Sequence, residues 1–468
     1  MKKYSIKGLI TLTLCLLNLG AIAENRRSID FIVKGDYVVT MNDAHQIIQN
    51  GAVAIESGRI AAVASFPEID RQYRAEKILT GKNRVVMPGL VNGHSHAAMT
   101  LLRGIADDMA LDEWLNKYIF PVERDFVDAE FVRVGTELAC WEMLRGGTTT
   151  FVDMYYYPET VAEVVDTCGI RALISATVID QKSPDANDAD ESLRNAVRFV
   201  SHWQNKHPRI TAIFGPHANY TLSADQLRAT RAEARKLGAT ISIHMAESMF
   251  EVDFALDNYG MGSVSMFDSI NFFNGPTIAA HMVWPSEREI EILSKRNVGV
   301  IYNPTSNMKT SAGVAPIVRM LEEGIAVGIG TDGAASNNDL DMWEEMRIGA
   351  LLQKVNRMDP KVLSAKTVLS MATRMGADAI GLGNSIGSLE PGKRADLIQV
   401  LMNDVHHTPS YDITSHLVYV TDEQDVDLVM VDGSVVFRDG RPLRIDRERV
   451  RQAASLLAQT IQRKMKEY

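Results

Sequence analysis

Hydrophobic and polar positions follow two different patterns along the chain. From about residue 30 to residue 86, short apolar runs such as Phe31-Ile-Val and Tyr37-Val-Val-Thr are separated by polar turns, and similar runs return at 395–400 and 428–437. Runs of this length between turn residues are typical of β-strands. The two strand-rich ends predict one small β-sandwich domain, assembled from residues 24–87 and 384–445.

The middle of the chain, residues 88–383, alternates apolar runs with helical stretches. Examples of these runs are Thr149-Thr-Phe-Val-Asp, Arg171-Ala-Leu-Ile-Ser-Ala, Thr240-Ile-Ser-Ile-His and Gly299-Val-Ile-Tyr. Repeated strand–helix units require a parallel sheet, and about eight of them close into a barrel. An open doubly wound sheet is the alternative, but no glycine-rich phosphate loop follows the first strand. The predicted fold class is therefore α/β, with a (β/α)8 TIM barrel.

The two termini carry further signals. Residues 1–23 combine Lys2, Lys3 and Lys7 with an apolar run and a small-residue site ending at Ala23. This pattern is typical of a secretory signal peptide, and the apolar run is too short to span a bilayer. We therefore expect an exported, periplasmic protein with no stable membrane insertion after cleavage. Residues 446–468 predict a C-terminal amphipathic helix.

Composition narrows the class of protein. The chain has 468 residues, of which 46% are hydrophobic and 23% are charged, so it can bury a large core. The formal net charge of -10 argues against a nucleic-acid partner, because such surfaces need clustered Lys and Arg. The composition indicates an acidic globular enzyme.

Polar side chains recur where the predicted barrel strands end. Because the ends of parallel barrel strands share one face, we expect these side chains to gather there. In an extended segment residues two apart point the same way, so the two histidines of a His-x-His pair can face one ion. The group consists of His94, His96, His217, His244, Glu247, His281 and Asp332.

The ordered motifs resemble those of the amidohydrolase superfamily, and most closely its 5'-methylthioadenosine/S-adenosylhomocysteine deaminase group. The resemblance covers nearly the whole chain after the signal peptide. Its motifs are Pro88-Gly-Leu-Val-Asn-Gly-His-Ser-His, Gly215-Pro-His, His244-Met-Ala-Glu, Ala280-His and Gly330-Thr-Asp-Gly-Ala-Ala-Ser-Asn-Asn.

The resemblance implies one divalent metal ion, with Zn²⁺ as the first choice and Fe²⁺ as the alternative. The ligands that it implies are His94, His96, His244 and Asp332. Imidazoles with a carboxylate suit either ion and leave a position open for water. Two-metal relatives use a bridging lysine at an earlier strand end, where this chain has Gly215-Pro-His217.

The same resemblance suggests catalytic roles for Asp332, His281 and Glu247. Asp332 would accept a proton from the attacking water, and His281 would orient that water. Glu247, three residues after His244, would carry protons to the ring nitrogen and to departing ammonia.

Substrate contacts also follow from the resemblance. Glu123 matches a residue that binds ribose hydroxyls, and His217 matches another substrate position. Trp114 would cover the purine, although packing between helices is an equal alternative. Family members that act on S-adenosylhomocysteine can carry an arginine where this chain has Ala176. We therefore favour methylthioadenosine or adenosine as the substrate.

The sequence thus predicts a hydrolase that deaminates an adenosine-type nucleoside to its inosine analogue and ammonia. Two alternatives stay open. One is an amidohydrolase that acts on a guanine-like, pterin or triazine ring, since the fold does not choose the substrate. The other is a catalytically inactive solute-binding barrel. The expected partner is a small purine nucleoside, and a homo-oligomer is compatible with the sequence.

Overall fold

A closed barrel forms the centre of the molecule. The computed structural model describes residues 26–109 and 111–465, so the predicted signal peptide lies outside the described residues. Within them, eight parallel strands close in the order β10-β11-β12-β13-β6-β7-β8-β9, which confirms the predicted barrel. The strands are β6 (Leu90–Ser95), β7 (Thr148–Tyr155), β8 (Arg171–Val178), β9 (Ile210–Pro216), β10 (Ile241–Met245), β11 (Thr277–His281), β12 (Gly299–Tyr302) and β13 (Val327–Ile329).

Branched apolar side chains fill the barrel interior. Val91, Val152, Leu173 and Ile301 belong to one buried cluster, which also includes Ile380 just after helix α16 (Arg374–Ala379). Alternate residues of a strand point to opposite faces, so these side chains face inward while their neighbours pack against the surrounding helices. This apolar packing fills the barrel interior, so polar groups gather at the carboxyl ends of the strands.

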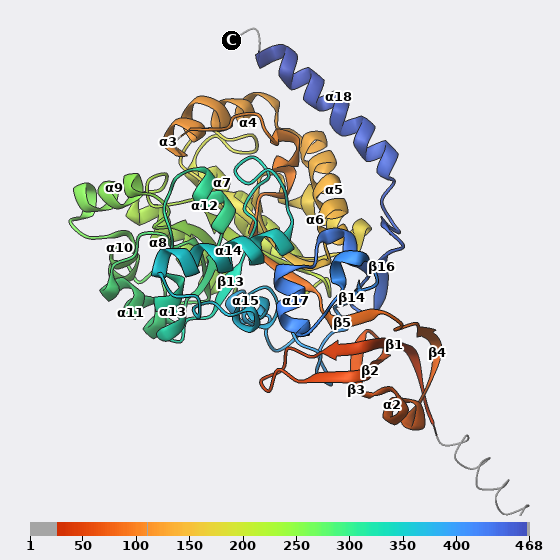
Figure 1. The fold of residues 1–468 in the computed structure, drawn as a ribbon. Helices are drawn as coiled ribbons and strands as arrows, with labels where there is room; N and C mark the ends of the chain where they lie inside the picture. The colour runs from red at the N-terminus through yellow and green to blue at the C-terminus, as the bar shows by residue number, and fades with distance from the viewer. Residues whose placement is uncertain (1–25, 110, 466–468) are drawn as a thin grey trace, which may run out of the picture.

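Helices surround the barrel, as Figure 1 shows. Several begin at a side-chain cap that satisfies a free backbone N–H; Asp188, for example, accepts from the Glu191 N–H at the start of α7. The covering helices include α5 (Ala129–Arg145), α6 (Pro158–Cys168), α7 (Ala189–Trp203), α8 (Ala224–Lys236), α9 (Met249–Tyr259), α10 (Ser263–Ser269), α11 (Glu287–Arg296) and α14 (Met342–Arg357).

Both ends of the chain build a second sheet beside the barrel (Figure 1). β5 pairs antiparallel with β14, which joins the two ends, and Val33, Val53, Leu397 and Met430 share one buried cluster. The described strands of this mixed sheet are β1 (Arg27–Val39), β2 (Ile47–Glu56), β3 (Arg59–Ser65), β4 (Tyr73–Leu79), β5 (Arg84–Pro88), β14 (Leu397–Leu401), β15 (Val426–Val431), β16 (Ser434–Arg438) and β17 (Arg441–Pro442).

The last helix, α18 (Arg447–Met465), runs along the outside of the molecule and contacts α5 (Figure 1). It buries Val450 and Ile461, whereas Leu456 on the same helix is exposed. None of the helices in the described part of the chain is both long enough and apolar enough to cross a membrane.

Candidate metal and active site

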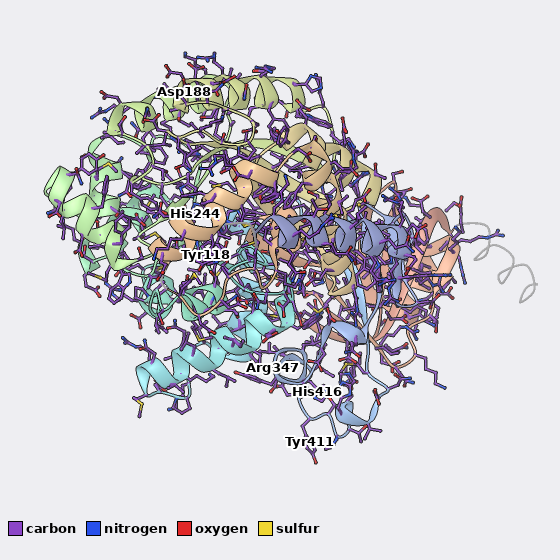
Figure 2. The ribbon with its side chains drawn as sticks, turned by 90° about the horizontal axis from the view of Figure 1, so that it is seen from above. Tyr118, Asp188, His244, Arg347, Tyr411 and His416 are labelled. Atoms are coloured by element: carbon purple, nitrogen blue, oxygen red, sulfur yellow. The ribbon has the colours of Figure 1, made fainter. Side chains whose placement is uncertain are left out.

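Strand ends bring the predicted polar residues to one end of the barrel. His94 lies in β6, His244 in β10 and His281 at the end of β11, while Asp332 follows β13 by three residues. In a parallel barrel the carboxyl ends of all strands open on the same face. Figure 2, seen from above, shows His244 in the central part of the molecule.

Side-chain atoms of four of these residues lie close together, in two overlapping groups that share His94. Nε2 of His94 lies 3.3 Å from Oδ1 of Asp332, and Nε2 of His96 lies 3.1 Å from the same oxygen. Nε2 of His244 lies 3.3 Å from Nε2 of His96. Ligand atoms bound at about 2.0–2.1 Å in a tetrahedral zinc site lie roughly 3.3 Å apart. The spacing of these atoms therefore matches a shared ion.

The outer nitrogens of three imidazoles are held by oxygen acceptors. An acceptor at Nδ1 keeps the proton on that nitrogen, so the lone pair of Nε2 points into the cluster. The acceptors are the Met154 carbonyl for His96 (2.6 Å), the His217 carbonyl for His244 (2.9 Å) and Asn307 Oδ1 for His281 (2.9 Å).

Asp332 is held with one oxygen facing the histidines. Its Oδ2 accepts hydrogen bonds from the hydroxyls of Ser306 at 2.7 Å and Ser336 at 2.8 Å. Its backbone has a left-handed φ of 62°, an unusual value for a residue with a side chain. Two residues earlier, the backbone of Gly330 passes close to β6. A Cβ at this position would lie only 2.8 Å from the His94 backbone nitrogen. The local backbone is therefore shaped around this carboxylate.

Burial governs the charges of the cluster. It lowers the pKa of His94 to about 4 and that of His217 to about 3. Burial also opposes charge on His96, but the adjacent Asp332 carboxylate outweighs it and raises the pKa of His96 to about 9. Although burial disfavours an ionised Asp332, the adjoining His94 and His96 hold the pKa of this carboxyl well below its usual range.

The donor set fits a bound cation. Oδ1 of Asp332 and Nε2 of His94 are buried and have no hydrogen-bond partner among the described residues. The Nε2 lone pairs of His96 and His244 face each other at 3.3 Å, which is repulsive unless a proton or a cation lies between them. A metal ion would satisfy all four atoms at once.

A cavity opens over this cluster, and its wall includes His96, His244, His281 and Asp332. Glu247 is buried in its wall, with Oε1 3.7 Å from Nδ1 of His281. Burial raises the pKa of Glu247. The backbone N–H groups of Ala246 and Glu247 both donate to the buried Glu251 carboxylate, at 2.8 and 2.9 Å. Glu251 thereby fixes the turn that carries Glu247.

The remaining predicted residues line the same cavity. Glu123, on α4 (Phe120–Phe126), is buried, and burial raises the pKa of its carboxyl to about 7. Its Oε2 accepts from the Tyr156 hydroxyl at 3.4 Å, while its Oε1 has no hydrogen-bond partner among the described residues. His217 and the buried Trp114 also contribute to the wall. Each residue that the sequence suggested for catalysis or substrate binding thus reaches one cavity.

The sequence of this chain matches the model of the amidohydrolase family over residues 85–436. That span exceeds half of the chain. The chain belongs to the amidohydrolase family.

Individual relatives of this amidohydrolase agree with the assignment. It is 42% identical over 420 residues to the 5-methylthioadenosine/S-adenosylhomocysteine deaminase of Thermodesulfovibrio yellowstonii, covering 89% of this chain and 95% of that protein. It is 43% identical to the 5'-deoxyadenosine deaminase of Methanosarcina acetivorans, covering 92% and 98%. The crystal structure of an adenosine deaminase from Xanthomonas campestris with bound zinc superposes with a TM-score of 0.91 at 34% identity, covering 93% and 99%.

A second hollow of about 1,120 Å³ adjoins the cavity of this amidohydrolase and shares Leu111, Leu115, Phe120 and Tyr220 with it. We call this second hollow the outer cavity. Asp180 is the one charged residue among its described lining side chains. Its aromatic lining residues are Phe120, Tyr220, Phe250, Phe254 and Tyr259.

Sequence reasoning missed the residues that support the site. Ser306 and Asn307 follow β12, and the rule that polar residues gather at strand ends could have pointed to them. Ser336 lies inside the motif that begins at Gly330, and its contact with Asp332 was not foreseen. No sequence signal distinguished Glu251 from a surface carboxylate, because its burial depends on how α9 packs.

Proposed function

We propose that this amidohydrolase removes the amino group of an adenosine-type nucleoside by hydrolysis, giving the inosine analogue and ammonia. The observation that carries the proposal is the position of Glu247, a buried carboxylate in the cavity wall next to His281 and the four-residue cluster. A carboxylate there can exchange protons with a bound ring. The relatives that are named deaminases support the same reaction.

One divalent ion, Zn²⁺ in preference to Fe²⁺, would be held by His94, His96, His244 and Asp332. When bound, such an ion lowers the pKa of a water molecule toward neutrality. The zinc in the Xanthomonas campestris structure supports this choice.

The side chains of this chain would then divide the proton transfers. Asp332 would accept a proton from the attacking water, since its Oδ1 carries no hydrogen bond from the described residues. His281, fixed by Asn307, would orient that water. A protonated Glu247 would first donate to the ring nitrogen, then take up the proton of the new hydroxyl as the C=O bond forms and pass it to the amino group, so that the C–N bond breaks and ammonia leaves. The proton held by Asp332 would then return Glu247 to its starting state.

Substrate recognition would rest on the cavity wall. Glu123 offers an unpartnered buried oxygen that suits the hydroxyls of a ribose. His217 and Trp114 would contact the substrate from the same wall. A free base such as guanine, which lacks the sugar, would leave Glu123 without a partner.

The outer cavity would receive the 5' substituent. Its described lining includes aromatic rings and the Asp180 carboxylate but no cation. Ala176 of β8 also takes the place of the arginine that the family resemblance associates with an amino-acid carboxylate. A neutral 5' group, as in methylthioadenosine or 5'-deoxyadenosine, should therefore be preferred to the charged tail of S-adenosylhomocysteine.

Measuring ammonia release tests both the proposed reaction and the proposed preference for a neutral 5' substituent. We expect the zinc-loaded protein to deaminate methylthioadenosine, 5'-deoxyadenosine and adenosine, to act at least tenfold more slowly on S-adenosylhomocysteine, and to leave guanine unchanged. If none of the adenosine compounds released ammonia, the proposed reaction would be wrong. Equal rates on S-adenosylhomocysteine would overturn only the 5' preference.

A further inference from the structure

A second group of histidines lies outside the barrel cavity. His406 and His407 occupy the short helix η3 (Val405–His407), His416 lies on α17 (Ile413–Tyr419), and Asp425 ends η4 (Glu423–Asp425). Figure 2 shows His416 well apart from His244 of the barrel cluster. The proposed deamination uses none of these residues.

The two neighbouring histidines approach opposite oxygens of one carboxylate. Nε2 of His406 lies 3.2 Å from Oδ2 of Asp425, and Nε2 of His407 lies 3.2 Å from Oδ1. One ligand atom from each of the three residues falls within 4.8 Å of the others. The two 3.2 Å contacts run to different oxygens, and the one to His406 is a hydrogen bond that an ion would replace. The three residues are therefore close enough to share one ion.

His407 carries an unpartnered nitrogen into this group. The residue is 3% exposed, and its Nε2 is buried without a hydrogen bond from the described residues. The nearby Asp425 oxygen satisfies the distance for an ion pair, yet the nitrogen and this oxygen are not aligned as a hydrogen bond. A buried nitrogen in this state costs free energy unless another ligand satisfies it.

His416 holds the ring of His407 in place. Nε2 of His416 lies 3.0 Å from Nδ1 of His407. Histidines that bind metals are commonly oriented by such a contact at the other ring nitrogen. Asp425 is fixed as well, because its Oδ2 accepts the Asp422 N–H at 2.8 Å and leaves Oδ1 for another partner.

An ion could also reach this group. The side chain of His406 is 39% exposed, and His407 lines a hollow of about 510 Å³ with Tyr37, Arg84 and Ser410. Arg84 would repel a cation, but its charge is paired with Asp427 at 2.7 Å. The group therefore combines a buried, oriented ligand with an open side for water.

We propose that His406, His407 and Asp425 form a second binding site for a divalent transition-metal ion, separate from the barrel centre. Two imidazoles and one carboxylate suit Zn²⁺ and similar borderline ions. A bound ion would join η3 to η4, so its effect would be on stability and not on the reaction.

Metal stoichiometry tests the site. The purified full-length protein is dialysed against zinc buffered at a low free concentration, and bound zinc per chain is measured by mass spectrometry. We expect two ions in the wild type, one in His406→Ala and His407→Asn, and two in His202→Ala, which removes an exposed histidine of α7. Because His406 is partly exposed, its variant should fold even if the His407 variant does not.

Two further readouts separate this site from the active centre. His406→Ala should keep wild-type deaminase activity yet lose part of the zinc-dependent rise in melting temperature. Asp332→Ala, which removes a barrel ligand, should retain the second ion. A wild type that binds one ion, or a His406→Ala variant that still binds two, would overturn the second site and leave the proposed reaction untouched.

Discussion

At the scale of single residues, several side chains of the site have one polar atom in a hydrogen bond and turn their other polar atom toward the cluster. Asp332 has one oxygen bound by two serines, and His244 has Nδ1 bound by a carbonyl, so each presents its other atom to the cluster. Such fixed partners remove the rotational freedom that a loose ligand would lose on binding. The same reasoning applies to Glu247, whose turn is fixed by Glu251.

Glu247→Gln should separate binding from turnover. The amide keeps the size of the side chain but cannot shuttle protons, so we expect unchanged zinc content and a fall in kcat of about 10²–10⁴-fold. Glu291→Gln, at an exposed position on α11, is the matched control and should be neutral. Near-normal turnover in Glu247→Gln, measured by ammonia release, would remove its role as proton carrier.

At the scale of elements, helices and strand ends support each other through buried carboxylates. Glu345 of α14 is fully buried, accepts the Asn337 amide at 2.7 Å and receives the Thr305 N–H at 3.3 Å. It thereby connects α14 to the segments that follow β12 and β13. Burial raises the pKa of its carboxyl from 4.5 to about 8.

This raised pKa predicts a pH dependence of stability. Between pH 4.5 and 8 the folded chain keeps a proton on Glu345 that the unfolded chain releases, so stability falls as pH rises, by up to about 1.4 kcal/mol per unit. Glu345→Gln should lose this part of the slope. The comparison is urea unfolding at several pH values, with Glu291→Gln at an exposed position of α11 as the control. Identical slopes in all three proteins would contradict the assignment.

At the scale of the whole molecule, a buried ion pair connects the barrel to the sheet built from both chain ends. Arg171, the first residue of β8, donates two hydrogen bonds to Asp396 at 2.7 and 3.1 Å. Their side chains are 7% and 2% exposed. Asp396 also accepts the Asp432 N–H at 2.7 Å. The pair therefore fixes the C-terminal strands of the sheet against the barrel.

Asp396→Asn should destabilise the protein by about 3 kcal/mol, because it removes the hydrogen-bonded partner of the buried Arg171 charge and leaves only Asp432, 3.8 Å away. The exposed pair between Arg319 and Glu287 is the matched comparison, and Glu287→Gln should cost far less, because solvent screens an exposed pair. Denaturant unfolding measures both. Equal losses in the two variants would show that the buried pair does not carry this interaction between the barrel and the sheet.

The sequence by itself determined the fold class and the composition of the barrel cluster. Strand–helix alternation predicted the barrel, and the polar residues that end its strands formed one candidate group, because parallel strands must open on one face. The family resemblance then selected His94, His96, His244 and Asp332 from that group as the metal ligands. These signals are local in the chain. Each can be read from a strand and the few residues after it.

Only the tertiary structure decided which polar side-chain atoms lack a hydrogen-bond partner and which are fixed by one. Ser306, Asn307 and Glu251 support the site through contacts with segments distant in sequence or through the packing of a helix. The grouping of His406 and His407 with Asp425 has the same origin, because it depends on how η3 and η4 meet. Burial and alignment arise from packing, so a sequence pattern shows which groups are present but not which atoms remain for a ligand.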